Sequence, residues 1–305
     1  MFAGMLPREV VHLPFEPGPF RMAMGLTGRP MAELIELDDK YLGEMAQRRW
    51  LLEQRHEEVF AALPDSETAR SDVLALLAGV LVARFSQWFC REGDSLHNRL
   101  TGERWNLAAP ECDPLEVAGR LVQEDLCVLS LREEKPVLVA GVVCFPSGWR
   151  LRDKLGQPLA KVHRPVPFYE ERLGGVVDRL MSRLKPGRLA VRLNWGVVAS
   201  GELHRPPATA SHAEANAVNA GERLFLRVER QTLSALPTSG AVLFGIRVHC
   251  YPLRSIAARP EIAARLAASV RALPHAMRRY KEIALFEEAL LGYLDSRSGA
   301  LARKL

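Results

Sequence analysis

The sequence predicts an α+β protein with a mainly antiparallel sheet. Helical periodicity occupies much of the first 120 residues, strand-like runs follow between about residues 125 and 250, and a helical pattern returns after Pro260. The strand-like runs come as two, then a helical crossing, then three, which differs from the regular alternation of strands and helices in parallel α/β folds. No G-x-G-x-x-G follows a strand, so we expect no nicotinamide site within this chain.

The N-terminal part of the chain is expected to be an arm followed by helices. Residues 1–30 are rich in Pro, Gly and Met and predict an irregular arm. Residues 36–63 carry apolar side chains among charges, which is typical of an amphipathic helix. A second helix is expected from about Thr68 to Phe89, apolar on most sides, and a third after Pro114.

The period becomes strand-like after Glu124. "DLCVLSL" and "PVLVAGVVCF" are separated by "REEK", a polar connection typical of a hairpin. A helix is expected over residues 168–184, and three further strands follow within residues 188–198, 222–233 and 240–250. Helices are expected after Pro260 and from about Tyr280 to Leu294. We therefore expect an arm and helical segment, residues 1–124, packed on a core formed by residues 125–305.

Composition indicates an ordinary globular chain. Hydrophobic residues make up 48% and charged residues 25%, and the formal charge of +5 is too small and too scattered to indicate nucleic-acid binding. The longest apolar run, residues 73–85, is shorter than the roughly 20 residues that span a bilayer, and the first 20 residues do not resemble a signal peptide. We therefore expect a cytoplasmic protein. Five cysteines without a C-x-x-C pair argue against a disulfide framework, a zinc-cysteine site and an iron-sulfur cluster.

Charged side chains alternate with apolar ones along the last three predicted strands. Those that share a face within one strand are Arg192 with Asn194, Arg227 with Glu229 and Gln231, and Arg247 with His249. A half-solvated sheet explains this pattern without any ligand. The alternative is a polar sheet face on which Arg192, Arg227 and Arg247 bind carboxylates of an anionic ligand.

His163 stands in "KVHRPVP", between a strand-like run and two prolines. A histidine before a helix is commonly a surface or hydrogen-bonded residue. Because the prolines fix local backbone angles, the same stretch also suits an imidazole that is held still as a ligand. The residues alone leave both interpretations open.

Three stretches together carry a family resemblance. They are "AGVVCFPSGWRLRDKLGQPLAKVHRPVP", "VRLNW" and "LRVERQTLSALPTSGAVLFGIRVHCYPL". In this order, over roughly residues 125 to 285, the chain resembles the haem-dependent oxidative N-demethylase family. The resemblance implies a PAS-like, five-stranded antiparallel sheet with flanking N- and C-terminal helices. It also implies a b-type haem that supports oxidative demethylation of a small secondary amine, such as dimethylamine, with O2 and release of formaldehyde.

The resemblance also implies partners. Electrons would come ultimately from NADPH through a reductase that carries flavin and an iron-sulfur centre. Because the cysteine spacing of this chain suits no cluster, we expect these carriers to be separate proteins. The alternative function is a non-catalytic haem or small-ligand sensor of the PAS type.

Site residues follow from the same resemblance. His163 is the preferred axial ligand of the iron, with the helix after Pro167 along the ring. His249 is the next candidate, followed by Cys144 and Cys250, which lie in apolar runs where a thiolate is poorly stabilised.

The charged residues of the strands take possible roles around the haem. Arg192, Arg227 and Arg230 are candidates to pair with the haem propionates, although their alternating faces prevent all three from acting on one side of a flat sheet. Glu229 is the candidate catalytic residue that pairs with the alkylammonium substrate, or else it pairs only with Arg227 or Arg230.

Overall fold

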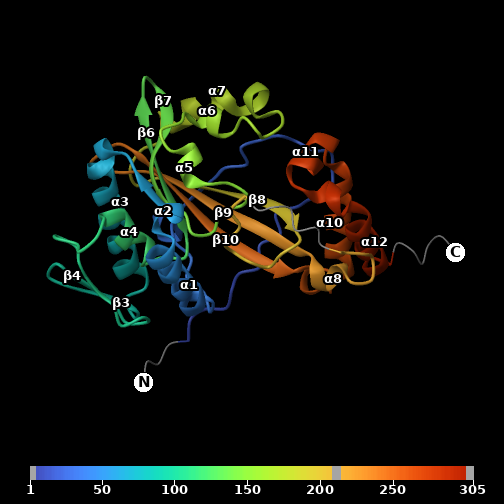
Figure 1. Cartoon of the computed structure of the whole chain (residues 1–305), viewed down its shortest axis with the longest axis horizontal. Coiled ribbons are helices and arrows are strands. Elements are labelled where there is room, and N and C mark those ends of the chain that lie inside the picture. Colours follow the sequence, from blue (N-terminus) through green and yellow to red (C-terminus); the bar gives the residue numbers. More distant parts are fainter. Residues whose placement is uncertain (1–4, 208–213, 300–305) are drawn as a thin grey trace.

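The computed structural model describes residues 5–207 and 214–299, and a seven-stranded antiparallel sheet runs through its centre (Figure 1). In sheet order the strands are β1 (Thr27–Arg29), β8 (Leu189–Val198), β9 (Phe225–Ala235), β10 (Val242–Pro252), β6 (Asp125–Arg132), β7 (Lys135–Val142) and β2 (Phe60–Ala62). Each neighbouring pair is antiparallel.

The α+β class is confirmed, and the five predicted strands are β6 to β10. The sheet is larger than the predicted five strands, because the segment before residue 125 adds β1 at one edge and β2 at the other. A separate three-stranded sheet, which we did not predict, contains β3 (Phe89–Glu92), β4 (Ser95–Asn98) and β5 (Arg104–Asn106). Strands of three or four residues are too short to show a clear alternation in the sequence. The division of the chain at residue 124 stays a prediction.

Helices flank the sheet on several sides. The α-helices are α1 (Tyr41–Gln54), α2 (His56–Val59), α3 (Glu67–Arg84), α4 (Pro114–Gly119), α5 (Leu151–Lys154), α6 (Leu159–Val162), α7 (Gly175–Met181), α8 (Ala220–Arg223), α9 (Leu253–Ile256), α10 (Pro260–Ala272), α11 (His275–Tyr280) and α12 (Glu287–Arg297). Single turns of 3-10 helix occur at Met31–Glu33, Pro64–Ser66 and Ile283–Leu285, and a π-helix at Glu170–Gly174. Within the described ranges, no helix is both long enough and apolar enough to cross a bilayer.

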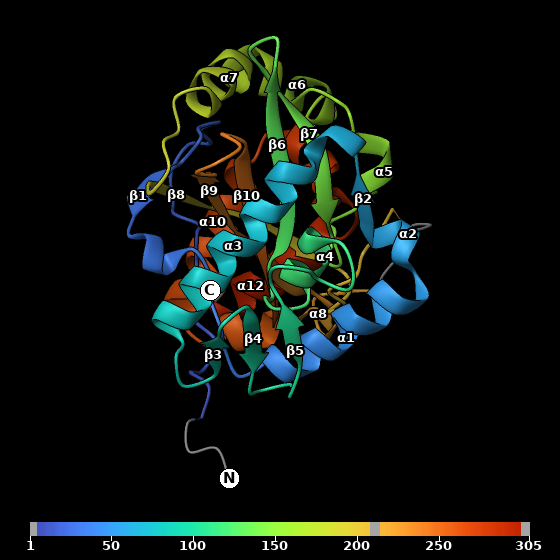
Figure 2. The same ribbon diagram turned by 90° about the vertical axis from the view of Figure 1, so that its left-hand side faces the viewer.

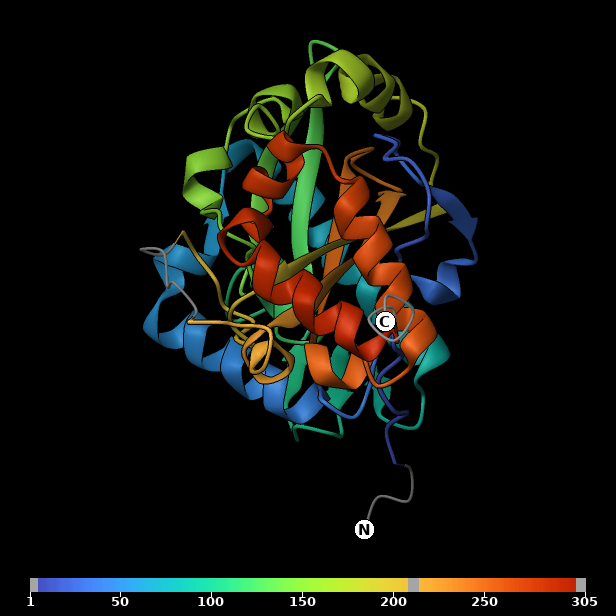
Figure 3. The ribbon, with the colours of Figure 1, turned by 90° about the vertical axis from the view of Figure 1, so that its right-hand side faces the viewer.

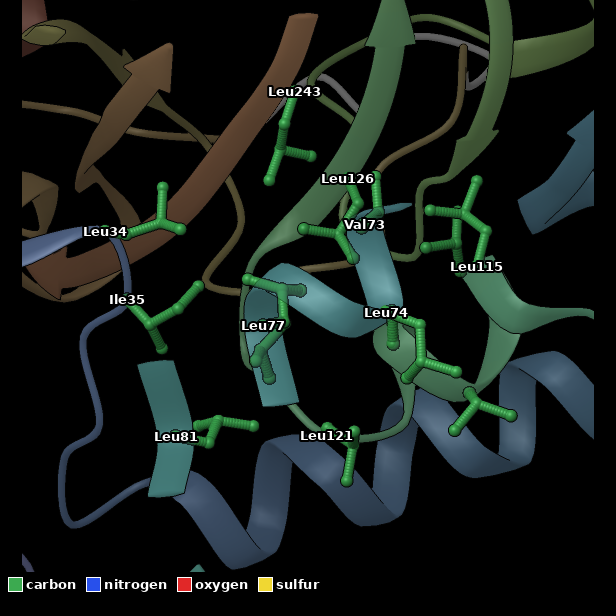
Figure 4. Packing of buried hydrophobic residues seen from close by; sticks show 14 of the residues in the cluster. Leu34, Ile35, Val73, Leu74, Leu77, Leu81, Leu115, Leu121, Leu126 and Leu243 are labelled. Atoms are coloured by element: carbon green, nitrogen blue, oxygen red, sulfur yellow. The ribbon is translucent and has the colours of Figure 1, made fainter. Parts of the chain in front are cut away.

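The N-terminal helices pack on one end of the sheet. Figure 2 shows α1, α3 and α4 together with the small sheet on this side. Leu74 and Leu77 of α3 pack in one buried cluster with Leu126 of β6 and Leu243 of β10 (Figure 4). The helix ends at Arg84, five residues earlier than predicted, because the chain turns there into β3.

The C-terminal helices cover another part of the sheet (Figure 3). Leu266 of α10 and Leu290 of α12 belong to a buried cluster that includes Leu226 and Val228 of β9. The predicted last helix begins at Glu287 instead of Tyr280, because α11 and a 3-10 turn occupy the residues before it.

The crossing from β7 to β8 passes over the opposite face of the sheet. It contains α5, α6, the π-helix and α7, and Figure 1 shows α6 and α7 above the strands. Leu159, Leu173 and Met181 of this segment pack in a buried cluster with Leu233 of β9 and Val242 of β10. The predicted helix over residues 168–184 is present as the π-helix followed by α7. This crossing positions His163.

Candidate functional site

The strand register brings several predicted site residues to one face of the sheet. Arg192 of β8 lies opposite Gln231 of β9, Asn194 lies opposite Glu229, and Gly196 lies opposite Arg227. Directly opposed residues of an antiparallel pair share a face. Arg192, Asn194, Arg227, Glu229 and Gln231 therefore point to the side that the β7–β8 crossing covers.

Arg230, Arg247 and His249 lie on the other face. Arg247 is opposite Arg230 in the register and forms ion pairs with Asp38 and Glu44 at 2.7 and 2.8 Å. Arg192, Arg227 and Arg247 therefore do not share one face, as the alternative interpretation of the strands required, since the alternation of β10 sends Arg247 to the opposite side. Arg230 is likewise separated from Arg192, and its Nε lies 3.0 Å from Glu36 Oε1.

His163 faces a pocket of about 490 Å³ formed by residues 160–171. Its Nδ1 lies 2.9 Å from the carbonyl oxygen of Leu159, one turn earlier in α6. Because a carbonyl only accepts, Nδ1 carries the hydrogen and the lone pair lies on Nε2. No described residue makes a hydrogen bond to Nε2. The histidine thus has the tautomer of a metal ligand whose other nitrogen is anchored by the backbone.

The ring of His163 is stacked on Tyr169, with 4.4 Å between centroids and 10° between planes. Phe168, just before Tyr169, has a left-handed φ of 66°, and the π-helix follows directly. Both features are uncommon, and both tend to occur at functional sites. They bring Tyr169 back over the imidazole, and the stacked ring fixes the orientation of His163.

The pKa of His163 is lowered from 6.5 to about 4. Burial is the main cause, and the charges of Lys154 and Arg192 act in the same direction, while the hydrogen bond to Leu159 opposes them. The imidazole is therefore neutral at pH 7, as a metal ligand must be.

Two cationic side chains near His163 lack a carboxylate partner. Arg192 makes no hydrogen bond or ion pair to a described residue, and its Nε is buried without a partner. Burial lowers its pKa, although the charge of Glu229 opposes this effect. Lys154 lies 4.2 Å above the ring of Trp149, and burial lowers its pKa too. Both side chains are half-buried, and because an unpaired charge that is partly removed from water is costly, this arrangement suits an anionic ligand.

Glu229 is held by three donors on the same face. Its carboxylate accepts hydrogen bonds from Ser147 Oγ at 2.6 Å, Gln231 Nε2 at 2.9 Å and Asn194 Nδ2 at 3.2 Å. Burial alone raises its pKa, but the bonds from Ser147 and Asn194 and the charge of Arg227 keep the pKa below its ordinary value. Glu229 is thus ionised at neutral pH. It forms no ion pair with Arg227 or Arg230 within the described residues.

Arg227 uses its guanidinium to hold two loops together. It donates to the carbonyl oxygens of Phe145 and Leu203 at 2.9 and 3.0 Å, and its Nε donates to Ser147 Oγ at 2.8 Å. These bonds use the Nε and Nη2 donors of the Arg227 guanidinium. They also hold Ser147 in place to donate to Glu229. Its position therefore indicates a structural role at this site.

Lys281 is a site residue that we did not predict from the sequence. It follows α11, and its Nζ contacts Asn194 Oδ1 at 3.2 Å and the carbonyl oxygen of Trp195. Burial lowers its pKa to about 8, although the charge of Glu229 opposes this effect. Lys154 was missed as well. Neither lysine stands in a distinctive sequence pattern, because only the tertiary fold brings them to the sheet.

The rival ligands are placed less favourably than His163. His249 lies on the opposite face, where Nδ1 is 2.9 Å from Glu9 and Nε2 is 3.2 Å from Glu36, so its ring points away from His163. Burial raises the pKa of Cys144 to about 12 and also raises that of Cys250, so both remain thiols at neutral pH. None of the three lines the pocket at His163.

A comparison with protein families identifies the chain. The family described as "haem-dependent oxidative N-demethylase, alpha subunit-like" matches residues 25–291. The match includes His163, all seven strands of the central sheet, α10 and α11, and it ends within α12. The family description indicates an oxidoreductase that depends on haem and works with a partner subunit. Because the match covers most of its length, the chain belongs to the haem-dependent oxidative N-demethylase, alpha subunit-like family.

Proposed function

We propose that this chain is the haem-binding subunit that removes a methyl group from a small secondary amine such as dimethylamine. Its core would be a PAS-like sheet that has become catalytic. The observation that carries the proposal is His163, whose Nδ1–H is fixed by the Leu159 carbonyl and whose Nε2 has no partner among the described residues. The family membership agrees with this reading.

The residues present fit a b-type haem. His163 Nε2 would be the iron ligand, and the neutral tautomer required for this is already in place. Arg192 and Lys154 supply positive charge that no carboxylate pairs with, which suits the two haem propionates. When bound, the haem supplies activation of O2 and one-electron chemistry. Arg230 and His249 lie on the face of the sheet opposite His163, so we assign them no role in haem binding.

Glu229 is proposed to bind the amine. A dialkylamine is protonated at neutral pH, so a desolvated substrate needs a negative partner. The ionised carboxylate of Glu229, oriented by Ser147, Asn194 and Gln231, meets this need. Lys281, with a pKa of about 8, is able to take or release a proton at Nζ near working pH. In the overall reaction, dimethylamine, O2, two electrons and two protons give methylamine, formaldehyde and water.

Electrons are proposed to come from a separate reductase with flavin and an iron-sulfur centre, fed by NADPH in the cytoplasm.

Formaldehyde release tests the proposed function. Haem-loaded protein mixed with dimethylamine and NADPH should produce little formaldehyde, and addition of a competent reductase and ferredoxin should start turnover. Formaldehyde at full rate without an added partner would contradict the subunit role. Haem binding with no turnover of any small secondary amine, even with the electron carriers, would indicate a sensor instead.

A further inference from the structure

A second cluster of potential ligands lies on the opposite face of the sheet, where the N-terminal arm crosses β10. His12 Nε2 and His249 Nε2 converge on one oxygen, Glu36 Oε2, at 3.3 and 3.2 Å. We infer that His12, Glu36 and His249 form a site for a divalent transition-metal ion of the zinc class, which fastens the arm to the sheet.

Two of the three separations between donor atoms match a tetrahedral site. Zinc bonds to imidazole nitrogen and carboxylate oxygen are about 2.0–2.2 Å long, so neighbouring ligand atoms on a tetrahedron are about 3.3–3.5 Å apart. The two measured separations are 3.3 and 3.2 Å, and the three ligand atoms all lie within 4.8 Å of one another. Two histidines and one glutamate, with a fourth position for water, form a common zinc donor set.

Outer contacts orient two of the three ligands, His249 and Glu36. His249 Nδ1 lies 2.9 Å from Glu9 Oε1, the carboxylate–histidine arrangement that directs Nε2 to a metal. The other oxygen of Glu36, Oε1, is held by Arg230 Nε at 3.0 Å, which leaves Oε2 for the ion. Each of these two ligands therefore has one atom fixed by the protein and one that points into the cluster.

The charges around the cluster also favour a cation. The nearby carboxylates are Glu9, Glu36, Asp38 and Glu44, and the cationic side chains paired with them are Lys40, Arg230 and Arg247. The carboxylates exceed these cationic side chains by one. With both imidazoles neutral, His249 Nδ1–H donates to Glu9, so the lone pair on Nε2 faces the Glu36 carboxylate, and a cation between them relieves the repulsion. A proton on Nε2 would do the same, and the metal content of the protein distinguishes the two.

The ion would join segments that are far apart in the sequence. The arm already contacts β10 beside the cluster, where the hydroxyl of Tyr251 donates to the Val10 carbonyl at 2.8 Å. The side chains of His12 and Glu36 are 15% and 22% exposed, so solvent can reach the fourth coordination position. His163 lies on the other face of the sheet, and the site is therefore structural and independent of the proposed haem.

Metal content tests this site directly. Untagged protein is incubated with zinc, desalted and analysed by mass spectrometry for metals, with haem iron counted separately as the pyridine haemochrome. We expect about one zinc per chain in the wild type, and less than about a fifth of that in His12→Gln and His249→Gln. His56→Gln is the matched control, because His56 pairs with Glu116 at 2.9 Å but has no second imidazole in a ligand cluster. It should retain zinc, as should His163→Ala.

Two further measurements, cobalt absorption and the zinc-dependent shift of Tm, test the same site. Cobalt in place of zinc should give the visible absorption of a tetrahedral site. Zinc at a hundred times its dissociation constant should raise Tm by about 4 °C, and His12→Gln should lose this shift. His12 is partly exposed, so we expect His12→Gln to fold. This variant therefore tests the site even if His249→Gln does not fold. A wild type without bound zinc, or equal zinc in wild type and His12→Gln, would overturn the inference. Neither result would bear on haem binding at His163.

Discussion

Replacement of Arg192 by Met should have opposite effects on the haem-free and haem-bound protein. Without haem, Arg192 is half-buried and its buried Nε has no partner, so its loss should leave the free energy of unfolding unchanged or raise it by up to about 1 kcal/mol. With haem, the lost charge-assisted bond to a propionate should cost about 1.5–3 kcal/mol, or roughly 10- to 150-fold in haem affinity. Met keeps the apolar stem and removes only the charge.

Arg227→Met is the matched control on the same face. Arg227 donates to the carbonyls of Phe145 and Leu203 and to Ser147, so its removal leaves buried acceptors unsatisfied. We expect about 3–5 kcal/mol of destabilisation without haem. Urea unfolding of the haem-free proteins and haem titration followed by absorbance measure the two effects. If Arg192→Met destabilises the haem-free protein as much as the control does, or binds haem like the wild type, the reasoning is refuted.

Two other predictions concern Glu229 and His163. Glu229→Gln should raise KM for dimethylamine up to about tenfold, corresponding to roughly 1.4 kcal/mol, whereas an unchanged KM at normal haem content would leave Glu229 a structural role only. The pKa of His163 is about 4 in the folded haem-free protein and 6.5 in the unfolded chain, so the unfolded chain binds more protons between these values. Unfolding free energy should therefore fall by about 1–2 kcal/mol as pH drops from 6.5 to 4, and urea titrations across this range should show a smaller fall in His163→Gln. Equal falls in both proteins would disagree with the lowered pKa.

The sequence predicted the long strands of the fold and missed the short ones. Strands β6 to β10 contain 8 to 11 residues each, enough for the alternation of apolar and polar side chains to be visible. β1 and β2 have three residues each and are defined only by their pairing with β8 and β7. Tertiary contacts, which a single sequence does not display, determine such edges.

The candidate site was predicted in part for similar reasons. Alternation within a strand correctly grouped Arg227 with Glu229, but it gave no information on which faces of different strands coincide. The alternative interpretation therefore grouped Arg247 with Arg192, although the register puts Arg247 on the other side. Lys281 reaches the site from the segment after α11, so neither periodicity nor a local motif marks it.

Haem loading of wild-type and His163→Ala protein tests the central claim most directly. After expression with adequate haem supply, the wild type should show a Soret band and a b-type pyridine haemochrome at about one haem per chain. His163→Ala should lose the haem or change its spin state, whereas Cys144→Ala and His249→Ala should not. A wild type that stays substoichiometric after loading, or a spectrum that follows His249 instead of His163, would contradict the account.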